Sequence, residues 1–458
     1  MNEPNLAGES RMHNLFFEPQ TEATDFATVL RDVQKYISAH YSGLLTDRTS
    51  EDTKEQIKRY ISKYLLDNRV AVKDMSSLQL TNKLYNEMAE FSFLTKYIYG
   101  DGIEEININS WRDIEVQYSN GTSQKLAEHF ESPEHAVNVV RRMLHVSGMV
   151  LDNATPVATG SLASNIRIAA MKTPIVDDDV GVCASIRIVN PLSLTRDDFV
   201  KEGTATEDML DFLSTCLRYG VSICVAGATS SGKTTLGGWL ASTLPDNKRV
   251  FTIESGSREL DLVKENGGKV VNSVIHSITK ISDNEKQEVD QNMLLQLALR
   301  FHPDYIIVGE MRSDEAYAAQ EAARTGHTVM TTIHANSCEA TWRRMVTLCK
   351  QAVNTDDNIL MDLVTEAFPL VVFCKQLENK ERRIMEIMEC EILPNGERKY
   401  NTVCRYKITD NHIENGRFVI TGHHETVCSI SESLKKRLLD NGLTHDQLEK
   451  LLRGGKTA

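Results

Sequence analysis

Residues 1–25 are polar and mixed, and a helical pattern of apolar positions follows them over the rest of the first hundred residues. Over Phe26–Ile37 apolar residues recur every three or four positions, and the same spacing returns near 57–65 and 80–99. This periodicity predicts amphipathic helices, because such residues share one helix face. We therefore expect a mobile tail over 1–25 and a helical segment over 26–100.

The pattern changes to alternation after residue 101. Apolar and polar residues alternate over 106–118, which predicts half-buried strands, and Ser132-Pro133-Glu134 supplies the signals that open a helix. We expect an N-terminal α/β domain over 101–190. Asn190-Pro191 is the best linker candidate, since the residue before proline is pushed out of helical geometry.

Beyond the linker, short apolar runs alternate with helical patterns. The runs predicted as strands lie at 223–226, 250–253, 305–308, 329–333 and 370–373. The predicted helices lie after Lys233 and near 285–300, 313–325 and 339–352. Strands that alternate with helices imply a parallel sheet covered on both faces. We expect this α/β domain to fill 191–458, with a strand-rich C-terminal extension that ends in two helices.

The charge balance argues against a protein that is dedicated to coating nucleic acid. Lys and Arg total 51 against 64 Asp and Glu, so the net charge is -13 and the summed field repels polyanions. The longest apolar runs, such as 221–228, are less than half of the roughly 20 residues that cross a bilayer. The N-terminus also lacks the features of a secretory signal, so we expect a cytoplasmic chain without a membrane span.

The nine cysteines form no C-x-x-C pair. Their scattered positions favour reduced, buried thiols over a disulfide framework or a zinc site.

A glycine-rich loop stands between the strand at 223–226 and the helix at Lys233. Its sequence fits G-x-x-x-x-G-K-[ST], whose backbone N–H groups wrap phosphates at a helix N-terminus. Lys233 would reach the β and γ phosphates, and Thr234 would hold Mg²⁺. The residues expected to bind the nucleotide are Gly227, Ala228, Thr229, Ser230, Ser231, Gly232, Lys233, Thr234 and Thr235.

Two carboxylates end predicted strands at the same sheet edge. Glu310 closes the strand at 305–308, and we assign it to water activation or to Mg²⁺ through a water. Glu254 closes the strand at 250–253 and could join the Mg²⁺ shell or hold the attacking water. The alternative for Glu254 is a structural acid that pairs with Arg258.

Two histidines flank the strand at 329–333. His327 and His334 could sense the γ-phosphate or pass its signal onward, whereas a lone histidine is usually structural.

These motifs closely resemble the type II/IV secretion-system ATPase superfamily, and within it the CpaF-type branch that serves tight-adherence pili. Four stretches stand in the family's order: GATSSGKTT, TIESGSREL, LRFHPDYIIVGEMR and TGHTVMTTIHANS. The likeness runs from about Asp101 to Gly422. It implies a RecA-like P-loop NTPase domain behind a small α/β domain, with ATP and Mg²⁺ bound between them.

The resemblance also implies a homohexameric ring at the cytoplasmic face of the plasma membrane, working on an integral membrane platform. Arg167 and Arg187 match the family's arginines that reach from the N-terminal domain toward the phosphates; the alternative for both is an ordinary surface ion pair. Glu254-Ser255 replaces the Glu-Asp of many members, so we expect Glu254 to act alone. The lack of C-x-x-C pairs argues against the zinc-binding pilus-extension branch.

The predicted function is therefore ATP hydrolysis coupled to pilus assembly, secretion or conjugative transfer. A nucleotide-gated scaffold and a nucleic-acid translocase with the same motor core remain alternatives. The net charge and the absence of interleaved aromatic and basic residues weaken the translocase.

Overall fold

The structure is a computed structural model that describes most of the chain. The described residues are 25–41, 51–73, 75–89, 91–119, 121–163, 165–189, 194–280 and 287–453. The predicted tail and the linker candidate Asn190-Pro191 fall outside them, apart from the last tail residue. Among the described residues, no helix is both long enough and apolar enough to cross a bilayer.

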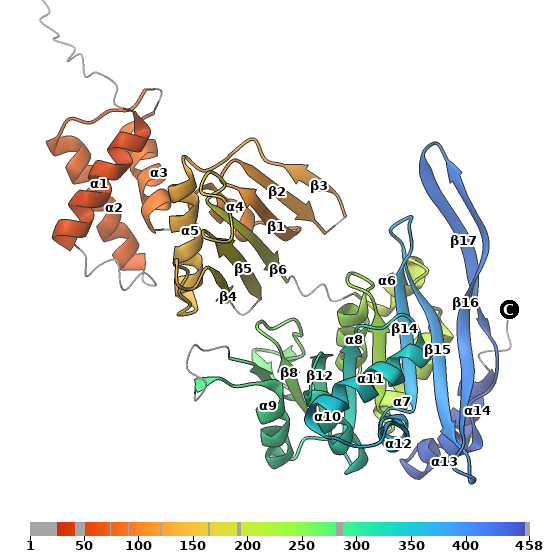
Figure 1. The fold of residues 1–458 in the computed structure, drawn as a ribbon. Coiled ribbons are helices and arrows are strands. Elements are labelled where there is room, and N and C mark those ends of the chain that lie inside the picture. The colour runs from red at the N-terminus through yellow and green to blue at the C-terminus, as the bar shows by residue number, and fades with distance from the viewer. Residues whose placement is uncertain are drawn as a thin grey trace, which may run out of the picture.

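Three helices form the N-terminal segment (Figure 1). They are α1 (Phe26–Tyr41), α2 (Glu51–Asp67) and α3 (Ser77–Ala89). The apolar stripe of α1 is buried against the stripes of α2 and α3, as with Val33, Ile61 and Leu84, none of which exposes measurable area. The third predicted helix is broken, because α3 is followed by a 3₁₀ turn at Ser92–Leu94 and the short α4 (Thr95–Ile98).

The next unit is a six-stranded antiparallel sheet in the order β3-β2-β1-β6-β5-β4. Its strands are β1 (Ile103–Ser110), β2 (Asp113–Tyr118), β3 (Ser123–Lys125), β4 (Val157–Ala163), β5 (Ile166–Lys172) and β6 (Val182–Ile188). The helix α5 (Pro133–Val146) covers one face, and Ser132 caps it by accepting the N–H of His135. The alternation over 106–118 is confirmed, since Ile106 and Val116 are fully buried.

A nine-stranded sheet forms the C-terminal unit in the order β11-β8-β12-β13-β7-β14-β15-β16-β17. The parallel strands are β7 (Ile223–Gly227), β8 (Arg249–Glu254), β11 (Ser273–Ile278), β12 (Tyr305–Met311), β13 (Thr328–Ile333) and β14 (Leu370–Gln376). The antiparallel strands are β15 (Arg382–Ile392), β16 (Arg398–Glu414) and β17 (Arg417–Thr426). A two-stranded ribbon, β9 (Glu265–Asn266) with β10 (Lys269–Val270), stands apart.

Helices cover both faces of this sheet. One layer contains α6 (Arg196–Lys201), α7 (Glu207–Arg218), α8 (Lys233–Ser242), α13 (Glu432–Asp440) and α14 (His445–Arg453). The other contains α9 (Gln291–Ala298), continued by the 3₁₀ turn Leu299–Phe301, with α10 (Glu315–Arg324), α11 (Cys338–Ala352) and α12 (Asp357–Ala367). Successive residues of β7 therefore enter different cores: Val225 packs on the first layer and Cys224 on the second.

The five predicted strands are confirmed as parallel strands, and β11 is a sixth that was not predicted. The sheet is mixed where the sequence predicted a parallel one. The strands β15 and β16 extend it in antiparallel fashion. The strand β15 was not predicted because Glu386, Glu389 and Glu391 interrupt its apolar run, whereas central parallel strands read as continuous apolar segments. The strands β16 and β17 form the strand-rich extension that was predicted.

Candidate functional site

The phosphate loop links β7 to α8, and its backbone requires special residues. Gly227 has φ 155°, Ser230 has φ 62° and Gly232, the cap of α8, has φ 91°. A Cβ on Gly227 would lie 2.3 Å from the carbonyl oxygen of Cys374 on the neighbouring β14. Only glycine therefore fits at Gly227, because both the turn and the adjacent strand exclude a side chain.

The lysine of the loop is folded back onto it. Lys233 is buried, and its Nζ donates a hydrogen bond to the carbonyl oxygen of Ala228 at 2.8 Å. Burial lowers the pKa of Lys233, and the charges of Arg187 and Arg312 lower it further. The cation thus lies inside the loop, where it can meet an anion.

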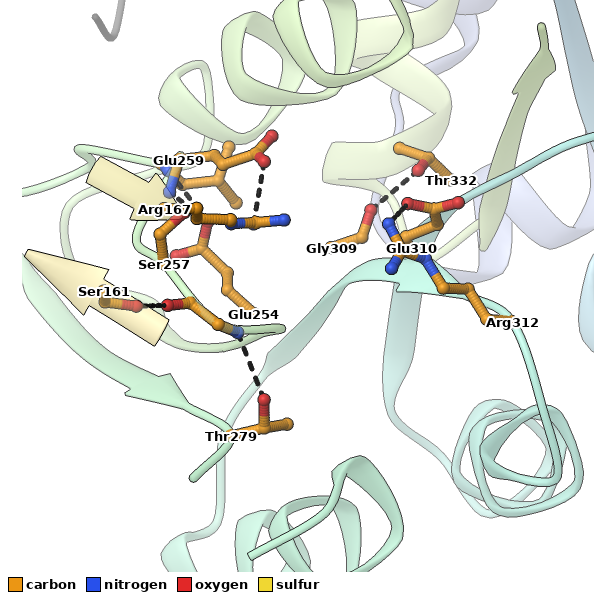
Figure 2. Close-up of polar contacts among 12 residues, drawn as sticks. Ser161, Arg167, Glu254, Ser257, Glu259, Thr279, Gly309, Glu310, Arg312 and Thr332 are labelled. Atoms are coloured by element: carbon orange, nitrogen blue, oxygen red, sulfur yellow. Dashed lines mark hydrogen bonds and ion pairs between the residues drawn. The ribbon is translucent and has the colours of Figure 1, made fainter. Parts of the chain in front are cut away.

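Glu310 lies among basic side chains at the end of β12. Its Oε2 accepts a hydrogen bond from Arg312 Nη2 at 2.5 Å, and its Oε1 is 3.0 Å from Nε2 of His334 (Figure 2 shows the pair with Arg312). Burial raises the pKa of Glu310, but the hydrogen bond from Arg312 and the charges of Arg312, His334 and Lys233 together hold it below its ordinary value. Glu310 is therefore an ionised carboxylate at neutral pH.

Glu254, at the end of β8, is held in a different way. Only 3% of its surface is exposed, and its Oε1 accepts the backbone N–H groups of Glu259 and Leu260 at 2.6 and 2.9 Å. Burial raises the pKa of Glu254 to about 7 despite these bonds. The alternative pairing with Arg258 is not seen, because Arg258 binds Asp261 at 2.7 Å.

Arg167 reaches from the N-terminal sheet into the C-terminal unit. Its Nε donates to Ser257 Oγ, and its Nη2 lies 2.8 Å from Glu259 Oε1 (Figure 2). Close by, Ser161 Oγ donates to the carbonyl oxygen of Gly256. These contacts come from β4 and β5, so the antiparallel sheet meets the loop after β8.

Arg187 lies opposite Arg167 in the register of β5 and β6, with its side chain exposed. Its charge contributes to lowering the pKa of Arg167, behind burial and the raising effect of Glu259. Arg187 is thus near the site without lining its cavity.

One cavity brings four of the predicted residues together. It is a partly open cavity between the two sheets, with about 500 Å³ of atom-free space that includes some open solvent. Its predicted lining residues are Arg167, Thr234, Glu254 and Glu310. The phosphate loop borders this cavity through Thr234, the second residue of α8.

The structure does not place His327 at this site. His327 precedes β13 and His334 follows it, while the phosphate loop follows the parallel neighbour β7. Because a six-residue strand spans roughly 20 Å, His327 lies at the opposite sheet edge. The expectation that both histidines lie beside the nucleotide is therefore corrected for His327, whose Nδ1 is buried and has no hydrogen-bond partner among the described residues.

Two charged residues of the cavity were missed. Glu259 adds a second carboxylate to the cavity beside Glu254, and Arg312 supplies the cation beside Glu310. In the sequence, one feature alone marked Glu259 and Arg312: each follows closely after a strand that ends in a candidate carboxylate.

The residues present fit a nucleotide with Mg²⁺. The buried Ser231 hydroxyl has no hydrogen-bond partner among the described residues, and the left-handed residues leave a cradle that a Cβ at Gly227 would fill. Thr234 and Glu310 offer oxygen atoms at the same cavity, the donor type that Mg²⁺ takes together with phosphates and water.

The parallel strands of the mixed sheet, the GKT loop and the strand-end carboxylates define a phosphate-loop nucleotide-binding domain of the RecA-like kind. A family model described as "Type II/IV secretion system protein" matches residues 154–451, more than half of the chain. The chain belongs to this family.

Curated relatives include the uncharacterized protein MJ0900 of Methanocaldococcus jannaschii, 30% identical over 266 residues that cover 58% of this chain and 45% of that protein. The conjugal transfer protein TrbB of Rhizobium radiobacter is 27% identical over 57% of this chain and 76% of TrbB. The type IV secretion system protein VirB11 of Bartonella quintana is 30% identical over 38% of this chain and 48% of VirB11. The chain spans about half the length of MJ0900 and of a second archaeal relative, MJ1287.

Two solved structures are also similar. The VirB11 ATPase of Brucella suis in complex with sulphate is 21% identical, with 65% of this chain and 95% of that chain covered at a TM-score of 0.33. The pilus retraction motor PilT with bound ADP is 16% identical, with 79% and 88% covered at a TM-score of 0.45.

Proposed function

We propose that the chain is an ATPase that couples Mg-ATP hydrolysis to pilus assembly, protein secretion or conjugative transfer. The observation that carries the proposal is the single cavity where Thr234 of the phosphate loop, Glu254, Glu310 and Arg167 meet. A loop that only bound phosphate would need neither the strand-end carboxylates nor an arginine from a second sheet. Family membership, together with relatives such as TrbB and VirB11, supports the coupling of hydrolysis to secretion or conjugative transfer.

The loop residues bind the triphosphate. Lys233 gives up the Ala228 carbonyl for the β and γ phosphates, which are stronger acceptors because they are charged. The start of α8 adds its partial positive charge at the same place.

Glu310 orients the attacking water. Because Arg312, His334 and Lys233 keep its pKa low, Glu310 is ionised and can accept a hydrogen bond from that water. Arg167 lines the same cavity and places positive charge where negative charge develops on the transferred group. Thr234, and Glu310 through a water, would hold Mg²⁺, which would supply positive charge to the phosphates.

We also propose that the protein works as a homohexamer of the CpaF-type branch. It would lie in the cytoplasm at the inner face of the plasma membrane and act on an integral membrane platform. The proposed division is a helical segment over 26–100, an α/β domain over 101–190 and a motor domain with its extension over 191–458. Separate apolar cores support three parts, although Leu94 and Ile98, which the proposed division puts in the helical segment, are buried in the core of the α/β domain. Mass measurement with a non-hydrolysable nucleotide tests the hexamer.

The activity is tested by steady-state phosphate release from Mg-ATP. We expect Glu310→Gln to bind ATP but to lose roughly a hundredfold or more in turnover, because the water loses its ionised acceptor. Lys233→Ala should lose nucleotide binding altogether. The matched control is Glu366→Gln, a carboxylate on α12 that pairs with Arg324.

Wild-type turnover in Glu310→Gln would contradict the assignment of that residue. Nucleotide binding without any turnover in the wild-type protein would favour the scaffold. Turnover that rises on adding single-stranded nucleic acid, with salt-dependent binding, would favour a translocase.

A further inference from the structure

The turn between β14 and β15 lies beside the phosphate loop. β14 runs parallel to β7, and Cys374 of β14 pairs with Gly227, where the loop begins. The carboxyl end of β14 and the turn over 377–381 therefore stand at the sheet edge that carries the loop. Arg382 is the first residue of β15 as the chain returns.

Arg382 touches the loop at two points. Its Nε donates a hydrogen bond to the carbonyl oxygen of Ser230 at 3.0 Å. Its Cδ lies 3.3 Å from the position that a Cβ on Gly232 would take, so its aliphatic stem covers that glycine. Ser230 is the one non-glycine residue of the loop with a left-handed φ, a conformation that costs free energy unless contacts hold it.

The neighbouring Arg383 holds Arg382 in place. Only 8% of Arg383 is exposed, and its Nη2 binds Glu381 at 2.6 Å. Its Nη1 donates to the carbonyl oxygens of Glu202 and Arg382 at 2.8 and 2.9 Å. The guanidinium also lies 5.6 Å from the ring centre of Tyr406. The backbone that presents Arg382 is therefore tied to a buried network rather than to a free turn.

We propose that Arg382 is a positioning residue for the phosphate loop. It holds the Ser230 peptide in its left-handed conformation before the nucleotide arrives, so that less ordering free energy is spent on binding. This role rests on the proposed nucleotide-binding function and adds to it a residue that stands outside the four motifs.

The position of Arg382 determines which kinetic constant should change. Arg382 does not line the cavity that contains Glu254 and Glu310. Its loss should weaken the binding of ATP and ADP alike while leaving the chemical step intact. A residue that touched the γ-phosphate would instead favour ATP over ADP and would change kcat.

The experiment compares Arg382→Ala and Arg382→Lys with the wild-type full chain. Affinities for ATP and ADP come from titration of the protein, and KM and kcat come from phosphate release. We expect Arg382→Ala to raise both dissociation constants and KM by roughly three- to tenfold, with kcat within about twofold, since one hydrogen bond to the loop is lost. Arg382→Lys should fall between, because it retains the charge and part of the stem.

The matched control is Arg405→Ala, an exposed arginine of β16 paired with Glu425, which should leave all four constants unchanged. Unchanged affinities in Arg382→Ala, a loss confined to ATP, or a fall in kcat of tenfold or more would overturn the proposal. If the alanine variant does not fold, the lysine variant decides: intermediate affinities support the role, and wild-type affinities overturn it.

A failure of the proposed function would give a different result from a failure of the role of Arg382. In that case the wild-type protein itself would neither bind nor hydrolyse ATP, and Lys233→Ala would match it. A wild-type protein that is active, beside a fully active Arg382→Ala, would remove only the role of Arg382.

Discussion

Arg167 and Glu259 form an ion pair at 2.8 Å between β5 of the N-terminal sheet and the loop after β8. Both side chains are largely shielded, with 26% and 18% exposed. The arginine expected to meet phosphate is therefore paired with a carboxylate of the C-terminal unit. If Arg167 binds phosphate as we propose, a nucleotide competes with Glu259 for it, and the ion pair then links nucleotide binding to the contact between the two sheets.

Removing the competing carboxylate should strengthen nucleotide binding. We expect Glu259→Gln to raise ATP affinity roughly three- to tenfold, because Arg167 is released to the phosphates, and Arg167→Ala to lower it by a similar factor. Titration with a fluorescent ATP analogue measures both. Glu425→Gln, at an exposed pair on the far strands, is the matched control. Weaker binding in Glu259→Gln would show that its carboxylate helps to hold the nucleotide.

The local motifs made part of this site predictable. The phosphate loop, Glu254 and Glu310 each follow an apolar strand directly, and the strand direction of a parallel sheet puts all three at one edge. The same rule places His327 at the far edge, so direct sensing of a γ-phosphate at the loop of the same chain is wrong for a reason already in the sequence, while passing the signal onward stays a prediction. The sheet order needed the structure, as did the antiparallel pairing of the strand-rich extension with β15, because the sequence pattern does not show which strands pair.

The partners of the carboxylates were not predictable. Glu259, Arg312 and Arg382 lie in loops or at strand ends, and what each one contacts depends on backbone turns that no periodic pattern specifies. The pKa of Glu254 likewise follows from its burial under the loop over 255–260, which the sequence does not show.

Glu254 should make stability fall as the pH rises. Its pKa is about 7 in the folded protein and about 4.3 in an unfolded chain. Between these values the unfolded state has lost the proton that the folded state retains, so the free energy of unfolding decreases with pH. The loss is on the order of 3 kcal/mol and is complete above about pH 7.

The substitution Glu254→Gln removes this titration while the amide oxygen still accepts the two N–H groups. Melting temperatures are measured for both proteins at about pH 5 and 8. Relative to the wild-type protein, the variant should melt at a higher temperature at pH 8 than at pH 5, by roughly 2–4 °C per kcal/mol. Glu366→Gln, at an exposed pair, should show no such gain. An equal shift at both pH values would mean that Glu254 does not retain its proton in the folded state.

Arg312 should set the pH at which Glu310 becomes active. In Arg312→Ala the raising effect of burial is less opposed, so the pKa of Glu310 rises toward or above its ordinary value. Because the water needs an ionised Glu310, the acid limb of kcat should move to higher pH. Phosphate release from about pH 5 to 9 measures the shift, with Arg343→Ala on α11 as the control. A uniform loss at every pH would instead assign Arg312 to the transition state.

We expect Gly227 to tolerate no side chain, because it has a positive φ and a close neighbour on β14. Gly326 shares the positive φ alone, so comparing the two glycines separates these effects. A Cβ at Gly227 would meet Cys374 O at 2.3 Å and Ser231 Oγ at 2.4 Å, whereas Gly326, also at positive φ, has nothing within 4 Å. Gly326→Ala should cost only backbone strain, about 1–2 kcal/mol.

Gly227→Ala should cost that strain and about 1–3 kcal/mol more from overpacking, because the carbonyl belongs to a central strand that cannot retreat. It should also weaken nucleotide binding at least roughly tenfold, since the loop must shift to relieve the overlap. Thermal melts and nucleotide titration measure the two effects separately. Equal stabilities for the two variants, or wild-type affinity in Gly227→Ala, would mean that the loop can move away from β14 without losing its cradle.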